Sequence, residues 1–145
     1  MVRIAAIESL AQIEDIRSIP EIEICLKDQD PLVRAYAAIG LAELGCDECL
    51  PRISNALAAE RDDAAAVGFL VAMYMLGDEA KLPELLALLS SSQYRVRCFG
   101  ANSLLDLNFS DEERRLAKTK LEEAMSHALA LADAEAMSRV LEKLK

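Results

Sequence analysis

The chain has 145 residues, a length typical of one domain, and its 25 acidic against 16 basic residues give a formal net charge of −9. An acidic chain with scattered basic residues repels phosphate backbones, so we expect no nucleic-acid partner. The longest uncharged run, residues 64–77, is shorter than the about 20 apolar residues that span a bilayer, and no secretory signal pattern is apparent. We therefore expect no membrane partner and a cytoplasmic location.

The sequence repeats itself about once every 31 residues. Leu10, Leu41, Met73 and Leu104 recur at spacings of 31, 32 and 31, and Ile13, Leu44, Leu76 and Leu107 follow the same steps. A unit of this length holds two short helices, which cannot bury their apolar face without stacking on further copies. The repeat therefore predicts an all-α fold, an α-α superhelix.

Prolines and turn residues divide each repeat into two helices. Pro20, Pro51 and Pro83 align, and each marks the start of a second helix, because proline is tolerated only in the first turn. The turn before it lies near Glu14-Asp15, Gly45 and Gly77, while Asp30-Pro31 and Asp62-Asp63 cap the next first helix. We predict repeats at about residues 2–32, 33–63, 64–95 and 96–109.

The end of the chain departs from the repeat. Ser110 and Glu113 have the spacing of a capping box, which predicts a longer helix, and Asp133 is predicted to cap a last one. We expect residues 110–145 to form a C-terminal cap within a single solenoid domain, residues 1–145. Val2-Arg3 corresponds to a point inside a first helix, so the open N-terminal face predicts self-association or missing repeats.

Several short motifs recur in a fixed order within the repeat. The second copy reads Asp30-Pro31-Leu32-Val33-Arg34, then Leu44-Gly45 and Pro51. Over residues 2–108 the chain resembles the short HEAT-like repeats of phycobilisome-lyase-type α-solenoids. The resemblance implies a HEAT-like solenoid of about four two-helix repeats plus capping helices, and a ladder of arginines that Ala66 interrupts.

The second helices line the concave side in solenoids of this type. Helical phase places six residues on that face as candidate partner-binding positions: Glu21, Ile24, Arg52, Asn55, Glu84 and Ala87. The row is chemically mixed and suits a protein groove better than a small-molecule pocket. The first interpretation is a non-catalytic protein–protein interaction module or adaptor that binds a protein partner along this face.

Two other classes of function stay open. The family resemblance implies a bilin lyase-like enzyme subunit, and the charge and small size fit an acidic inhibitor or immunity protein that masks a basic enzyme. Acidic pairs recur at the turn into each second helix: Glu14, Asp15, Asp47, Glu48, Asp78 and Glu79. These carboxylates either cap free N–H groups or form an acidic rim that attracts a basic partner.

Cysteine and histidine supply little chemistry. Cys46 and Cys49 have ligand spacing, but no second pair completes a zinc site; a redox pair at a helix start is possible, although Asp47 and Glu48 oppose thiolate formation. We expect Cys25 and Cys98 to be reduced, small core residues.

His127 is the only histidine and is expected at the surface or half-buried rather than as a general base. Phe69, Met73, Tyr74 and Met75 are expected in the core. The sequence thus predicts no catalytic residue, no metal and no cofactor.

Overall fold

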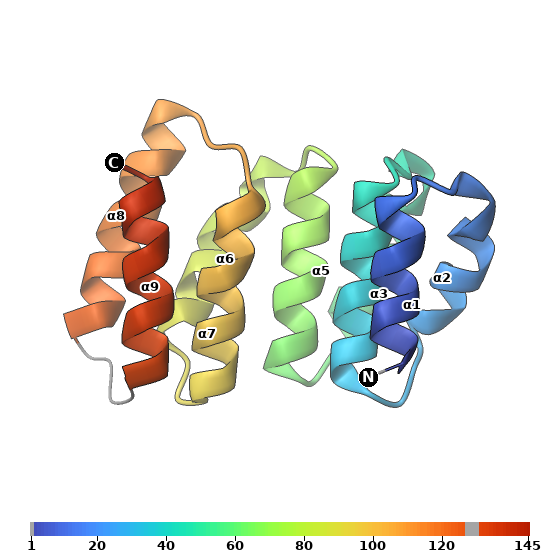
Figure 1. Cartoon of the computed structure of the whole chain (residues 1–145), viewed down its shortest axis with the longest axis horizontal. Coiled ribbons are helices and arrows are strands. Elements are labelled where there is room, and N and C mark those ends of the chain that lie inside the picture. Colours follow the sequence, from blue (N-terminus) through green and yellow to red (C-terminus); the bar gives the residue numbers. More distant parts are fainter. Residues whose placement is uncertain (1, 127–130) are drawn as a thin grey trace. The chain divides into compact units, whose positions relative to one another are not determined.

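A computed structural model describes residues 2–126 and 131–145, and all regular elements in these ranges are helices (Figure 1). Within them, no helix combines the length and the apolar character that crossing a bilayer requires. The chain divides into two compact units, Met1–Leu82 and Pro83–Lys145. The single domain predicted from the length stays a prediction. His127 lies outside the described residues.

The first unit contains two layers of helices. Its α-helices are α1 (Val2–Gln12), α2 (Ile19–Cys25), α3 (Pro31–Glu43), α4 (Leu50–Ala59) and α5 (Asp63–Met75). The first helices of the repeats, α1, α3 and α5, pack side by side, whereas α2 packs against α3 and α4 against α5 (Figure 1). Short 3₁₀ helices, η1 (Ile16–Ser18), η2 (Asp47–Cys49) and η3 (Glu79–Lys81), connect the layers.

The predicted helix starts are confirmed at the first helices. The Asp30 carboxylate accepts a hydrogen bond of 2.9 Å from the Leu32 N–H, and Pro31 is the first residue of α3. The Asp62 carboxylate accepts from the N–H groups of Ala64 and Ala65 at the start of α5. These side chains satisfy backbone donors that have no partner within the helix. Proline is the second residue of α2 and α4, as the alignment of prolines predicts.

The core of the first unit lies between the two layers. Phe69, Met73 and Tyr74 of α5 are buried as predicted, but Met75 is 37% exposed. The expectation for Met75 is wrong because Met75 is the last residue of α5, where the packing that buries residues on all sides of this helix ends. Small residues let α3 and α5 approach closely, since a Cβ built on Gly68 would lie 2.5 Å from the Ala35 Cα.

The chain passes from the first unit to the second within α6 (Leu82–Ala87). The second unit continues with η4 (Leu88–Ser90), α7 (Tyr94–Ser103), η5 (Leu104–Asp106), α8 (Asp111–Ser126) and α9 (Leu131–Lys143). Both α7 and α8 pack against α9.

The capping box at the start of α8 is confirmed. The Ser110 N–H donates to Glu113 Oε2 at 2.8 Å, and the Glu113 N–H donates to Ser110 Oγ at 3.3 Å. The predicted cap at Asp133 is wrong, because Asp133 lies inside the described range of α9, Leu131–Lys143. Acidic residues are favourable both at the cap and in the first turn of a helix, so the residue type alone does not fix the boundary.

Candidate functional site

A groove of about 1410 Å³ lies between α2 and α4 in the first unit. Residues of both second helices line it, together with residues of the loops that follow them and two arginines, Arg3 and Arg34, from the first helices. The second helices of two neighbouring repeats and the loops that follow them therefore form one surface. A ligand in the groove would contact both repeats.

The structure brings together three of the six predicted partner-binding residues. Ile24, Arg52 and Asn55 line the groove. Glu21 is exposed on α2 but lies outside the lining. Glu84 and Ala87 are exposed on α6 in the second unit, so they are not part of this groove.

Ile24 gives the groove an exposed apolar centre. Its side chain is 74% exposed although Ile22, two residues earlier on the same helix, is buried. An isoleucine in water contributes nothing to the core, whereas covering it would remove apolar surface from water, worth about 25 cal/mol per Å². Ile24 is thus the most exposed large apolar side chain in a groove that also contains Pro20, Ala56 and Ala59.

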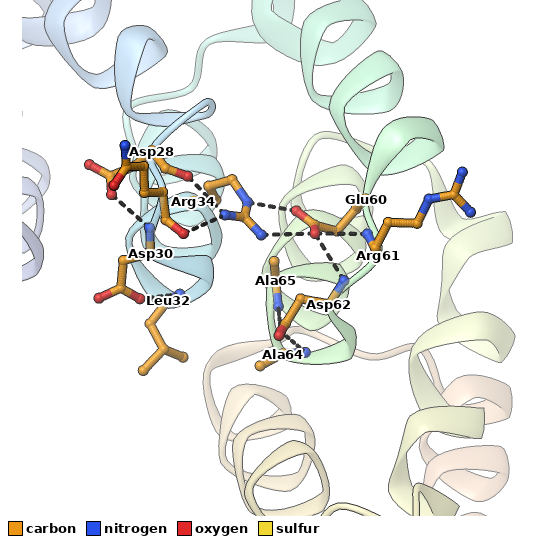
Figure 2. A network of polar contacts seen from close by, with 10 residues as sticks. Asp28, Asp30, Leu32, Arg34, Glu60, Arg61, Asp62, Ala64 and Ala65 are labelled. Atoms are coloured by element: carbon orange, nitrogen blue, oxygen red, sulfur yellow. Dashed lines mark hydrogen bonds and ion pairs between the residues drawn. The ribbon is translucent and has the colours of Figure 1, made fainter.

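Arg34 joins the two loops that border the groove (Figure 2). Its guanidinium donates to both Glu60 oxygens, at 2.7 and 2.9 Å, and to the Asp28 carbonyl oxygen at 2.8 Å. The pair is largely shielded, with the Arg34 side chain 18% exposed and that of Glu60 8% exposed. A bidentate guanidinium–carboxylate pair fixes direction as well as distance, so it holds the loop after α2 against the loop after α4.

The Glu60 side chain also accepts hydrogen bonds from the backbone of the two residues that follow it. The N–H groups of Arg61 and Asp62 donate to Glu60 Oε1 at 2.8 and 2.9 Å. Burial by itself raises the pKa of Glu60, but the hydrogen bonds from Arg34 and from these two N–H groups outweigh it and lower the pKa. The hydrogen bond to Glu60 likewise raises the pKa of Arg34.

The preceding repeat has an equivalent arginine–carboxylate ion pair, which is more exposed. Arg3 pairs with Asp28 at 3.0 Å, with the Arg3 side chain 60% exposed. In the second unit, Arg97 donates to the Ser91 carbonyl oxygen at 2.6 Å, six residues before it, as Arg34 does to Asp28. The arginine ladder implied by the family resemblance thus uses carbonyl and carboxylate oxygens of the loops. Sequence reasoning missed the acidic partners of Arg3 and Arg34, which lie 25 and 26 residues after them, a spacing close to the repeat length.

The groove is richer in cations than the chain as a whole. Its charged lining consists of Arg3, Lys27, Arg34, Arg52 and Arg61 with Glu23, Asp28 and Glu60. Three ion pairs use all three acids: Arg3 with Asp28, Arg34 with Glu60, and Arg52 with Glu23. Within the described part of the chain, Lys27 and Arg61 form no ion pair, and Figure 2 shows the Arg61 side chain directed away from Glu60. An acidic chain therefore presents a locally positive groove.

The predicted acidic rim shows mixed roles. Asp15 caps η1 by accepting from the Arg17 N–H, and the hydrogen bond from the Arg17 side chain lowers the pKa of Asp15. Asp78 occupies the same cap position before η3 without a side-chain capping bond. Capping thus accounts for Asp15 and not for Asp78, and attraction of a basic partner stays a prediction for Glu14, Asp47, Glu48, Asp78 and Glu79.

The four cysteines fall into a bonded pair and two free thiols. Cys46 and Cys49 form a disulfide, with Cys49 buried and Cys46 half-buried. Cys25 and Cys98 are free, as expected, but both are half-buried rather than fully in the core, with Cys25 packed against its edge. Burial, and then the charge of Asp28, raises the pKa of the Cys25 thiol. In the described ranges no group of three or more His, Cys, Asp or Glu side chains is placed to hold a metal ion.

Comparisons with known proteins place these features in a family. The family of HEAT repeats matches residues 20–106, and the PBS lyase HEAT-like repeat matches residues 2–28. A solved structure, the complex of CpcE and CpcF of phycocyanin lyase from Nostoc sp. PCC7120, aligns with 97% of this chain and 73% of its own at 14% identity and a TM-score of 0.47. A search of curated proteins found no match. Because the HEAT-repeat match covers more than half of the chain, the chain belongs to the HEAT-repeat family.

Proposed function

We propose that this chain is a non-catalytic protein-interaction module that binds a protein partner along its second helices, in the groove between α2 and α4. The observation that carries the proposal is the groove itself, in which an exposed isoleucine lies among charged side chains contributed by two repeats. HEAT repeats commonly serve as recognition surfaces, which supports the class of function.

The walls of the groove are pre-organised. Arg34 and Glu60 tie the two bordering loops, and Arg52 of α4 pairs with Glu23 of α2. A surface that is already ordered loses little conformational entropy on binding, so more of the contact energy is available for affinity. An apolar contact surrounded by polar groups is also the usual composition of a protein interface.

The test uses two matched isoleucines. Ile24 lines the groove and is 74% exposed, whereas Ile13, which follows α1, is 69% exposed and lies outside the groove lining. A partner captured from native extract and then purified should bind the Ile24→Asp variant at least about tenfold more weakly, since a central apolar anchor is worth more than about 1 kcal/mol.

The Ile13→Asp variant is the control and should bind like the wild type. If both variants bind equally well, the groove is not the binding surface. Circular dichroism of both variants checks that the fold is retained.

A second candidate is a bilin lyase-like subunit, supported by the match of residues 2–28 to the PBS lyase HEAT-like repeat. This candidate predicts a shift in bilin absorbance when pigment and chain are mixed. An unchanged spectrum at micromolar concentrations of both would remove it.

A further inference from the structure

The disulfide between Cys46 and Cys49 lies in a turn that the other repeats make without cysteine. The residues equivalent to Cys46 are Asp15 and Asp78, and those equivalent to Cys49 are Ser18 and Lys81. The backbone at the cap is the same in all three copies: φ and ψ are −81° and 87° at Asp15, −78° and 76° at Cys46, and −84° and 74° at Asp78. The turn therefore does not need the disulfide.

The disulfide is also a weak constraint on the unfolded chain. Cys46 and Cys49 are three residues apart, and the loop-closure entropy that a disulfide removes grows with the size of the loop. The turn does not require this disulfide, and the disulfide adds little stability. The property that distinguishes this repeat is therefore the redox chemistry of the cysteine pair.

The two sulfurs lie in different surroundings. Cys46 is half-buried and so within reach of solvent, whereas Cys49 is fully buried at the cap of α4. Exchange between a thiol and a disulfide requires one accessible sulfur to meet the substrate, while the second cysteine closes the ring from inside. Cys46 is the accessible sulfur of this pair and Cys49 the buried one, so the pair meets that requirement.

A carboxylate contacts the buried sulfur. Glu23 Oε1 of α2 lies 3.3 Å from Cys49 Sγ, and Arg52, one turn further along α4, pairs with the same oxygen. In the disulfide no proton lies between Glu23 and the sulfur, whereas the thiol of a reduced Cys49 would donate a hydrogen bond to this oxygen. Arg52 keeps the carboxylate aimed at the place where that proton must leave.

We propose that Cys46 and Cys49 form a reversible thiol–disulfide exchange site, with Cys46 as the residue that attacks the substrate and Glu23 as the group that accepts the Cys49 proton. The reduced pair acts on a substrate disulfide: the Cys46 thiolate attacks one substrate sulfur, a mixed disulfide forms, and the other substrate sulfur leaves as a thiolate. Cys49 then gives its proton to Glu23 and attacks Cys46 Sγ, which releases the second substrate thiolate.

The two electrons of the pair end on the substrate, whose disulfide becomes two thiols when each thiolate takes up a proton, one from water and one by way of Glu23. An external dithiol regenerates the reduced pair by the reverse steps. The proposal does not rest on the proposed binding function, although the site shares Glu23 and Arg52 with the groove.

The experiment uses the full chain with Cys25→Ala and Cys98→Ala, so that only the pair reacts. The chain is equilibrated in glutathione buffers of varied ratio, trapped with a maleimide and weighed by mass spectrometry. An exchange site gives both dithiol and disulfide across these buffers, whereas a pair that stays oxidised in excess reduced glutathione, or that never forms the disulfide, would overturn the proposal.

Variants separate the roles of the two cysteines and of Glu23. Cys49→Ser should accumulate the mixed disulfide of glutathione with Cys46, and the absence of this species would contradict the assigned order. Glu23→Gln should slow closure of the mixed disulfide about a hundredfold, the scale of general base catalysis, while Glu21→Gln on the same helix should leave it unchanged. Equal rates in the two variants would remove Glu23 from the mechanism.

The class of substrate follows from two parallel assays. Faster reduction of insulin by dithiothreitol, followed as turbidity, would identify protein disulfides as substrates. Exchange with glutathione alone would restrict the site to small thiols, and exchange with neither would overturn the proposal.

Discussion

The first unit contains two contacts between neighbouring first helices, which we call the α1–α3 seam and the α3–α5 seam. In the α3–α5 seam, Gly68 faces the backbone of Ala35, whereas in the α1–α3 seam Gly40 faces the Ile7 side chain. Arginines at equivalent positions brace both seams, but Arg34 with its partner is shielded and Arg3 is mostly exposed. Equivalent repeat positions therefore carry different energies, because burial differs.

Gly68→Ala should be the most damaging substitution. The new Cβ would lie 2.5 Å from the Cα and Cβ of Ala35 and 2.6 Å from its carbonyl oxygen, so the two helices would have to separate. We expect a loss of about 3 kcal/mol in the free energy of unfolding, at the upper end of overpacking costs. Urea denaturation followed by circular dichroism measures it.

Gly40→Ala is the matched control for this substitution. Its Cβ would lie 2.8 Å from the Cγ2 methyl of Ile7 and 3.9 Å from Ala11 Cβ, both side-chain atoms rather than backbone, and alanine favours the helix by about 1 kcal/mol relative to glycine. The change should stay within about 1 kcal/mol of zero. Equal losses for the two alanines would show that backbone contact does not distinguish the seams.

Arg34→Met should have the next largest effect. Methionine keeps much of the length but leaves the shielded Glu60 carboxylate without the guanidinium that donates to both of its oxygens. We expect a loss of about 2 kcal/mol, below the cost of breaking a fully buried pair because the Arg34 side chain retains some exposure. The double variant Arg34→Met with Glu60→Gln should recover part of that loss in the same urea assay.

The pH dependence of stability reports on the same pair. The folded state lowers the pKa of Glu60 from its ordinary value of 4.5, so its contribution is complete above that pH and is lost as the pH falls through the folded pKa. The wild type should therefore lose stability below about pH 4.5 more steeply than Glu60→Gln. Parallel curves of unfolding free energy for the two proteins between pH 6 and 3 would contradict this assignment.

Sequence periodicity predicts the fold because the repeat carries several agreeing signals. Aspartate caps, aligned prolines and a capping box each satisfy a local backbone requirement, so they indicate helix boundaries without knowledge of the tertiary structure. Met75 and Asp133 show the limit of such signals. Met75 is partly exposed because it ends a buried helix, and Asp133 lies inside α9, where an acidic residue is also favourable.

The candidate site was only partly predictable. Helical phase places Ile24, Arg52 and Asn55 on one face, because their exposure follows from the helix alone. The contact of Glu23 with Cys49 and the pair of Arg34 with Glu60 depend on how one repeat packs on the next. Sequence spacing within a single repeat does not contain that information.

Glu14→Gly tests the turn that leads from each first helix to the second. Glu14 adopts a positive φ of 53°, and the equivalent residues Gly45 and Gly77 have φ of 68° and 95°. A left-handed conformation costs a residue with a side chain about 1 kcal/mol or more, although glycine also loses more entropy on folding. We expect Glu14→Gly to raise the unfolding free energy by about 0.5 kcal/mol, and Gly45→Ala to lower it. A destabilised Glu14→Gly variant would mean that the Glu14 side chain contributes more than its strain removes.

Arg3→Met should have the smallest effect, and it is the counterpart of Arg34→Met. Both arginines are at the same position of the repeat, and both reach an acid in the next loop. The Arg3 side chain is 60% exposed, so water screens the pair and replaces its hydrogen bonds when the guanidinium is removed. The Asp28 carboxylate also keeps a partner in this variant, because it accepts a hydrogen bond of 2.9 Å from the Asp30 N–H. We expect a change within about 0.5 kcal/mol in urea, further reduced at 1 M salt. A loss as large as that of Arg34→Met would show that the arginine at this repeat position stabilises the seam by its packing rather than by a shielded ion pair.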